Sequence, residues 1–209
     1  MSLNKDSQAV LDFWFGVASD GDPVLVGEQL QEKMKFWFSG GEELDRQIAE
    51  KFGELVKTAL AGGLEEWEQD VETSLALVLL LDQFPRNIHR GQPAAFSGDD
   101  RALRLARRFA GSDARLRLSV PQAVFLLMPY QHVEDIELQE EGVKHYSALE
   151  HSAPEGQQAF AKGVREYAEL HRDIVRRFGR FPHRNRILDR RDTPEEAEWL
   201  ADGAPTFGQ

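Results

Sequence analysis

Two stretches of the chain, residues 72–84 and 123–128, are apolar on nearly every side when they are placed on a helix. Such a helix is stable in water only when other helices surround it, so these stretches mark the centre of the fold. Elsewhere, from about Val10 to Trp199, apolar residues recur at intervals of three and four, which is typical of amphipathic helices. No segment alternates convincingly between apolar and polar residues over strand length. The sequence therefore predicts an all-α protein.

Proline and glycine residues divide this pattern into eight or nine helices. Pro85 is expected to end the first central helix or to lie just beyond its end, and Pro129 to kink or stop the second. Gly179 is expected to end a long helix near the C-terminus. Because the connections are short, we expect the helices to stack as antiparallel hairpins within a single domain, residues 1–209.

Composition and charge restrict the environment of the protein. The chain has no Cys, which excludes disulfides, thiolate metal ligands and a Cys nucleophile. The longest apolar run, Leu75 to Leu81, is too short to cross a bilayer, and residues 1–9 lack the apolar region of a signal peptide. A net charge of −11 opposes non-specific binding to nucleic acids or membranes. We therefore expect a cytoplasmic protein.

A group of polar residues lies at the end of the first central helix. Asp82 and Gln83 fall in its last turn, and Arg86 and Asn87 follow directly after Phe-Pro. At least one of the first two side chains should be buried, and a buried carboxylate needs a partner. The nearest candidates are Arg86 and Arg90.

A second segment, residues 178–185, has a similar order of residue types, with Phe-Pro followed by Arg-Asn after the intervening His183. Arg180 precedes its Phe-Pro pair. Two interpretations are open. The Arg and Asn side chains of both segments bind free carbonyl groups at helix C-termini. Alternatively, Arg86 and Arg184 converge with their Asn neighbours on one pocket and hold a carboxylate or phosphate.

Histidine and glutamate side chains are candidates for proton transfer. His171 lies between Tyr167 and Val175 on the apolar face of its helix, which suits either a core residue or a general base. His132 and Glu134 follow the break at Pro129 and can share a surface there. The histidine spacing matches no metal-binding motif, and no nucleotide-binding loop is present. We therefore expect no metal and no other cofactor.

Four parts of the sequence together resemble a known family: Val10 to Gly16, Leu81 to Gly91, Met128-Pro129 with His132 and Glu134, and Phe178 to Asn185 with Thr193 to Glu196. They are similar to the bacterial domain-of-unknown-function family 924. The resemblance implies a tetratricopeptide-like, all-helical fold and implies no activity, because the family has none assigned. Two positions depart from its pattern: Val133 stands where Ser is expected, and Asp189 stands where Gly is expected.

The favoured hypothesis is that the protein binds, with or without turnover, a small anionic molecule in a pocket lined by Arg, His and Asn. Two guanidinium groups hold the anion, a histidine moves protons, and a carboxylate orients that histidine. The catalytic candidates are His171, His183 and Glu134, and the ligand-binding candidates are Asp82, Gln83, Arg86, Asn87, His132, Arg180, Arg184 and Asn185.

Two alternatives remain open. In the first, the protein is a tetratricopeptide-like scaffold without catalysis, which binds a peptide in a groove with the Arg-rich residues 101–117 as one wall. In the second, every polar cluster is structural and only joins the ends of helices. Because these alternatives and the ligand hypothesis all stay open, the sequence does not decide whether the protein is an enzyme.

Overall fold

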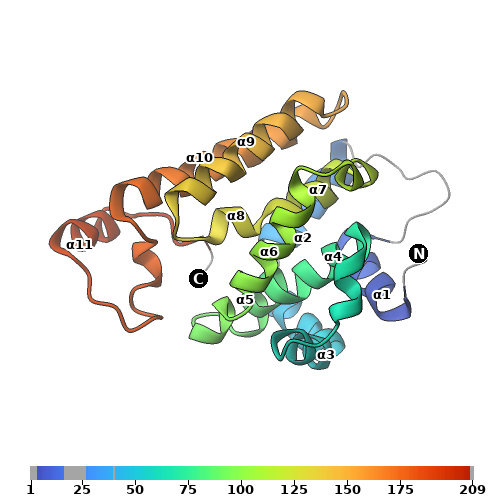
Figure 1. The fold of residues 1–209 in the computed structure, drawn as a ribbon. Coiled ribbons are helices and arrows are strands. Elements are labelled where there is room, and N and C mark those ends of the chain that lie inside the picture. Colours follow the sequence, from blue (N-terminus) through green and yellow to red (C-terminus); the bar gives the residue numbers. More distant parts are fainter. Residues whose placement is uncertain (1–3, 17–26, 40, 208–209) are drawn as a thin grey trace.

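The computed structural model describes residues 4–16, 27–39 and 41–207, and within these ranges every regular element is helical (Figure 1). The first half holds α1 (Lys5–Phe15), α2 (Gly27–Ser39), α3 (Gly41–Leu60), α4 (Val71–Val78), α5 (Phe84–Ile88) and α6 (Asp99–Ala110). The second half holds α7 (Val120–Leu127), α8 (Pro129–His132), α9 (Ile136–Ser152), α10 (Gln158–Phe178) and α11 (Pro194–Ala201). The predicted all-α class is confirmed.

The number of helices also agrees with the prediction. A π turn joins α4 to α5, and a single residue joins α7 to α8. When each of these pairs is counted once, the described residues contain nine α-helical segments, in addition to short 3-10 helices. No described helix combines the length and apolar character that crossing a membrane would require.

The two all-round apolar segments form the centre of the molecule. No residue from Leu75 to Leu81 or from Ala123 to Leu127 is more than 1% exposed. Helices α1, α6 and α7 pack against α4, which accounts for the missing polar face of its sequence. Each fully buried Leu or Val side chain here contributes about 1.5–3 kcal/mol relative to exposure.

Pro85 does not end the first central helix. The chain passes from α4 through the π turn at Leu79–Gln83 into α5, which continues to Ile88. In the π turn, the Phe84 N–H donates to the Leu79 carbonyl, five residues earlier. The prediction for Pro85 was wrong because this wider turn accommodates a residue that lacks an N–H and whose ring would collide with a carbonyl in a regular helix.

The π turn also fixes where α6 begins. Gly98 lies directly before α6, and a Cβ atom at this position would overlap the carbonyl oxygen of Leu81. Only glycine allows the two backbones to approach this closely. The contact places Asp99, the first residue of α6, beside α5.

The other two predicted breaks are present. The helix of α7 ends at Leu127 and resumes as α8 at Pro129, so Pro129 produces a kink. Gly179 has φ of +70° and donates its N–H to the Val175 carbonyl, which ends α10. This left-handed conformation is easily adopted by glycine alone.

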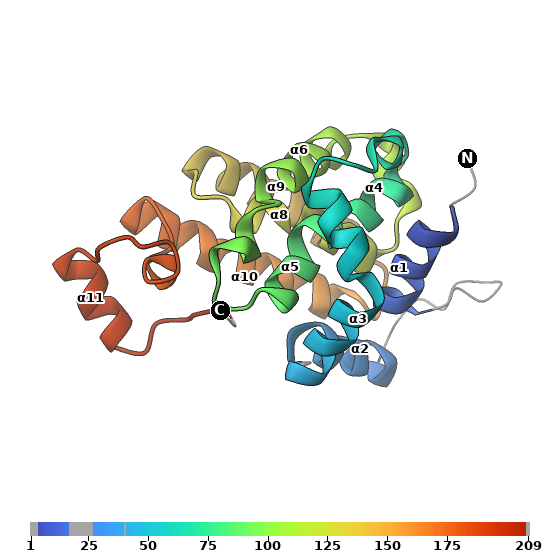
Figure 2. The ribbon, with the colours of Figure 1, turned by 90° about the horizontal axis from the view of Figure 1, so that it is seen from below.

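Helices α9 and α10 pack along each other on one side of the molecule, and α11 lies at its far end (Figures 1 and 2). A small second core holds this end together, with Ile174, Val175 and Phe181 buried against Trp199 and Phe207. The wider tetratricopeptide-like stacking of hairpins stays a prediction.

Candidate functional site

A cavity of about 860 Å³ lies between α2, α5, α8 and α10. Apolar residues line much of it: Met34, Trp37 and Phe38 from α2, Met128, and Ala159, Phe160, Gly163 and Val164 from α10. Polar groups line another part of it: Gln83, Arg86, Asn87, Arg90, Gln131, His132 and His171. The cavity therefore has both an apolar wall and a set of hydrogen-bonding groups, as small-molecule sites in proteins commonly do.

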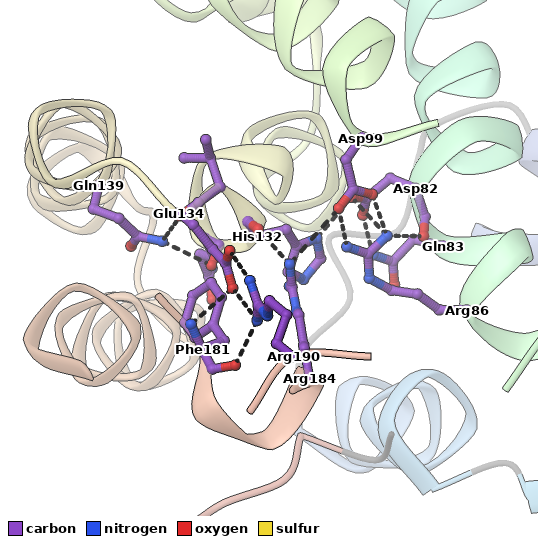
Figure 3. A network of polar contacts seen from close by, with 12 residues as sticks. Asp82, Gln83, Arg86, Asp99, His132, Glu134, Gln139, Phe181, Arg184 and Arg190 are labelled. Atoms are coloured by element: carbon purple, nitrogen blue, oxygen red, sulfur yellow. Dashed lines mark hydrogen bonds and ion pairs between the residues drawn. The ribbon is translucent and has the colours of Figure 1, made fainter. Parts of the chain in front are cut away.

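The two Phe-Pro segments meet at Asp99 (Figure 3). Arg86 donates to both carboxylate oxygens of Asp99, from Nη1 at 2.8 Å and from Nη2 at 2.9 Å. Nη1 of Arg184 lies 3.9 Å from Oδ2 of the same carboxylate. Both guanidinium groups also lie against the ring of Phe96, at 5.6 and 4.6 Å from its centroid. The two arginines thus converge, but on a carboxylate that belongs to the protein itself.

Asp82 is fully buried and has three polar partners. Its Oδ1 lies 2.6 Å from Nδ1 of His132 and 3.2 Å from Nη1 of Arg86. Its Oδ2 accepts a hydrogen bond from Nε2 of Gln83 at 2.6 Å. Burial by itself would raise the pKa of this carboxyl, but Arg86 and His132 hold it well below its usual value. Asp82 is therefore ionised at neutral pH, and its predicted partner Arg86 is present.

The other predicted partner, Arg90, instead pairs with Asp45, with Nη2 3.0 Å from Oδ1. Asn87 donates to the same oxygen from Nδ2 at 2.7 Å. Each arginine at the polar end of the cavity is therefore matched by a carboxylate of the protein. A bound anion would find hydrogen-bond donors here rather than an uncompensated positive charge.

His132 lies between the main cavity and a smaller one of about 160 Å³ that is also lined by Asp99, Glu134 and Arg184. Burial lowers the pKa of His132, and Arg86 lowers it further, against the attraction of Asp82. The ring is then neutral at pH 7. Its Nδ1–H donates to the Asp82 carboxylate, which leaves the lone pair on Nε2.

His171 faces the same cavity from α10, with its ring centroid 6.3 Å from that of His132. It is 3% exposed, and burial lowers its pKa to about 3. Its Nδ1–H donates to the Tyr167 carbonyl at 2.8 Å. The ring of Phe207 stacks on it, with centroids 4.0 Å apart. His171 therefore forms part of the cavity wall and is neutral at pH 7.

Gln131 was not among the predicted site residues. It is 3% exposed and lines the cavity; its side chain lies beside the Tyr146 hydroxyl, but its Nε2 makes no hydrogen bond of standard geometry within the part of the chain that the structure describes. A buried donor without a partner costs about 1–3 kcal/mol, which a ligand oxygen would recover. No sequence pattern marks this residue, because an isolated Gln beside a Pro kink is ordinary.

Glu134 lies outside the main cavity and anchors the second Phe-Pro segment. It accepts two hydrogen bonds from Arg190, at 2.6 and 2.9 Å, and one from the N–H of Phe181 at 2.8 Å. Burial alone would raise its pKa, but these partners keep it below its usual value. Its position is that of a structural anchor between α8 and the turn after α10.

Arg180 and Asn185 also lie away from the main cavity. Nε of Arg180 pairs with Glu196 at 2.6 Å, and Nδ2 of Asn185 donates to Asp192 at 2.7 Å. Both side chains therefore hold α11 and the loop before it. The Arg-Asn pair of the second segment is divided, since only Arg184 turns toward α5.

Arg184 is buried and His183 is partly buried, and neither lines the main cavity. Arg184 donates from Nη1 to the His132 carbonyl at 2.9 Å, and burial, together with Arg86, lowers its pKa to about 10. Burial and Arg184 lower the pKa of His183 to about 3. The ring of His183 packs against Phe207. Arg184 and His183 therefore contact the cavity-lining residues His132 and Phe207 but do not line the cavity themselves.

Two further expectations concern regions outside this cluster. Residues 101–117, the groove wall of the scaffold hypothesis, do not line the main cavity. Arg101 instead pairs with Glu68 at 2.7 Å, and Arg104 and Arg108 are exposed. In the described ranges, no three His, Asp or Glu side chains are grouped so that they would hold a metal ion.

Comparison with known proteins places this chain in a family. The family described as "Bacterial protein of unknown function (DUF924)" matches residues 10–204. The chain belongs to the DUF924 family. A solved structure of a protein of unknown function from Agrobacterium tumefaciens is similar to it, with a TM-score of 0.76 and 32% sequence identity over 94% of this chain and 97% of that one. No curated protein matches.

One departure from the DUF924 pattern has a structural counterpart. Asp189, where the resemblance places a glycine, has φ of +54°. This is the left-handed region that glycine adopts freely and that Asp tolerates better than most residues. The expected glycine therefore reflects backbone conformation at this loop position and carries no chemistry.

Proposed function

We propose that this DUF924 protein binds a small acyl compound in the 860 Å³ cavity, with a carbonyl-bearing end at the polar groups and an apolar chain along α10. A carboxylate of this kind is the small anionic molecule that the sequence suggests. The observation that carries the proposal is the division of the cavity wall into apolar and hydrogen-bonding parts.

The apolar part of the wall suits a chain of carbon atoms. Ala159 and His171, both on α10, are separated by twelve residues, which is about 18 Å along a helix. Trp37 and Phe38 of α2 line the cavity together with the N-terminal part of this stretch. Methylene groups against these side chains would each contribute about 0.8 kcal/mol.

The polar part suits an oxygen atom. Nε2 of Gln131 is a buried donor that makes no hydrogen bond of standard geometry to the described residues, and His132 and His171 are neutral rings that line the same cavity. Because the nearby arginines are already paired, we expect hydrogen bonding to dominate over charge attraction. An acid and its methyl ester should therefore bind with affinities of the same order.

Thermal-shift measurements with straight-chain carboxylates from butanoate to dodecanoate, and with their methyl esters, test this function. Gly163→Leu is the blocking variant, since Gly163 lines the cavity and a Cβ there meets no atom within 4 Å. Gly53→Leu in α3 is the matched control: it is equally uncrowded, and Gly53 does not line the cavity. Leu should stabilise both helices by about 1 kcal/mol relative to Gly.

The wild type and Gly53→Leu should gain melting temperature as the chain lengthens, up to the length that the cavity holds. Gly163→Leu should fold but gain nothing from any of these compounds. If none of the compounds stabilises the wild type, or if both variants respond alike, this cavity is not an acyl-binding site.

A further inference from the structure

We propose that the cavity is a hydrolytic active site for acyl esters, in which His132, oriented by Asp82, activates a water molecule and Gln131 binds the carbonyl oxygen. This inference rests on the proposed function and adds a reaction to it. It is carried by the arrangement of one carboxylate, one imidazole and one amide at the polar end of the cavity (Figure 3 shows the first two).

The carboxylate–imidazole pair is rigid. Oδ1 of Asp82 lies 2.6 Å from Nδ1 of His132, and Asp82 is held from other sides by Arg86 and by Nε2 of Gln83. Because an ionised carboxylate only accepts hydrogen bonds, the His132 proton sits on Nδ1 and Nε2 is the basic atom. Asp82 also stabilises the imidazolium that forms when Nε2 takes up a proton.

His132 suits this role better than the histidines that the sequence suggested. The Nδ1–H of His171 donates to a neutral backbone carbonyl, which stabilises a developing imidazolium less than a carboxylate does. His171 is also covered by the stacked ring of Phe207. His183 does not line the main cavity. Only His132 combines a carboxylate partner with a place in the cavity wall.

Gln131 supplies the second element. Its Nε2 is a buried donor that lies beside the Tyr146 hydroxyl without a hydrogen bond of standard geometry to the described residues, and it precedes His132 in α8, the short helix after the kink at Pro129 that lines the cavity. A donor prepared in this way stabilises the negative charge that develops on a carbonyl oxygen during acyl transfer.

The reaction balances with water as the only co-substrate. The oxygen of water bonds to the carbonyl carbon while Nε2 of His132 takes one proton from that water. The electron pair of the C=O π bond moves onto the oxygen that Gln131 binds. When this pair returns, the bond from carbon to the alcohol oxygen breaks, and the leaving oxygen takes the proton from His132. The products are a carboxylic acid and an alcohol.

Hydrolysis of p-nitrophenyl butanoate and octanoate by the wild type and by His132→Gln tests the proposal. We expect His132→Gln to lower kcat by about 100-fold or more with little change in KM. Gln131→Leu should lower kcat by about 100-fold as well. His145→Gln is the matched histidine control and should retain the activity, because His145 also lies beside a carboxylate, Glu141, but does not line the cavity.

Asp82 is tested as a positioning residue through the pH profile of kcat/KM. The charged groups that act on His132 are Arg86, Asp82 and Asp99. Since Asp82 raises the pKa of His132, Asp82→Asn should move the midpoint of the profile to lower pH as well as lower kcat. If Asp82→Asn does not fold, His132→Gln and Gln131→Leu still decide the question.

Failure of this inference is separable from failure of the proposed function. If octanoate stabilises the wild type and His132→Gln equally, but the two hydrolyse p-nitrophenyl octanoate at the same rate, the site binds acyl compounds and does not hydrolyse them. Hydrolysis that persists in Gly163→Leu would place the reaction outside the cavity and would equally overturn the proposal.

Discussion

The two Phe-Pro segments share their order of residue types and differ in structure. Phe84-Pro85 lies inside a continuous helix, whereas Phe181-Pro182 lies in a reversal of the chain after α10. The difference arises before the proline. Gly179 adopts φ of +70° and ends α10, while the residues before Phe84 form a π turn that carries the helix past its proline. The same order of residue types therefore gives a continuous helix in one segment and a chain reversal in the other, depending on the turn that precedes it.

The two segments also differ in what their polar residues do. Those of the first, such as Gln83, Arg86 and Asn87, line the cavity. Those of the second, Arg180 and Asn185, hold α11, and only Arg184 reaches across to Asp99. One segment thus forms the site and the other attaches the C-terminal helix to it. The following predictions test this division, beginning with the largest expected effect.

Asp82→Ala should lower the free energy of unfolding by about 3–5 kcal/mol, because it removes a buried carboxylate that both Arg86 and His132 contact. Glu196→Ala is the corresponding change for the second segment, because Glu196 of α11 pairs with Arg180 of that segment. Its partner Arg180 has 27% of its side chain exposed and can turn to water, so about 2 kcal/mol should be lost. Urea denaturation measures both changes. A larger loss of stability in Glu196→Ala than in Asp82→Ala would contradict the different roles of the two segments.

Gly98→Ala should destabilise the protein by about 2–3 kcal/mol, because the added methyl group overlaps the Leu81 carbonyl of the π turn. Gly111, at the other end of α6, has φ of −97° and open space around a Cβ, so Gly111→Ala is the matched control and should be close to neutral. Equal melting temperatures for the two variants would show that the π turn does not depend on this contact.

Acidification should act through His171, which packs on Phe181 of the second segment. Its pKa is about 3 in the folded chain against an ordinary value of 6.5, so the unfolded chain binds the proton first. The stability is then unaffected above ~pH 6.5 and falls by about 1.4 kcal/mol per unit as pH decreases below it. In His171→Asn this contribution to the slope should be absent, as urea midpoints compared at ~pH 7.5 and ~pH 5.5 would measure. An unchanged slope would contradict the neutral, buried state of His171.

Asp189→Gly should stabilise the loop after the second segment by up to about 1 kcal/mol, because φ of +54° is strained for Asp and free for Gly. The control is Asp202→Gly, at a position with φ of −78°, where glycine removes no strain and should gain nothing. Melting temperatures of the two variants make the comparison. A gain in both, or in neither, would mean that backbone strain at this loop is negligible.

The sequence alone determined the all-α class and the position of the central helices. Apolar residues at all-round and three-to-four spacing identified the central helices α4 and α7 and the surrounding amphipathic ones, because burial follows hydrophobic pattern within a single segment. Gly179 and Pro129 also acted as predicted, since each effect depends on the local backbone. Membership of the DUF924 family followed from motifs spread along the chain and is confirmed.

Part of the site was also accessible from the sequence. Gln83, Arg86, Asn87, His132 and His171 line the cavity as a group. They were found because polar residues at the ends of buried helices need partners, and such partners gather where helix ends meet. Arg180 and Asn185 were placed in the same group by their motif, and the structure sets them beside α11 instead.

Only the tertiary structure decided the partners and the shape of the site. Asp99 joins Arg86 and Arg184 because Gly98 packs on the π turn, and the cavity forms where residues of α2 and α10, far apart in the chain, line a common space. The pairing of Asp82 with His132, fifty residues further along, depends on the same packing. Local sequence fixes which face of a helix is buried, but contacts between distant segments depend on how those faces fit together, and this fit is a property of the whole core.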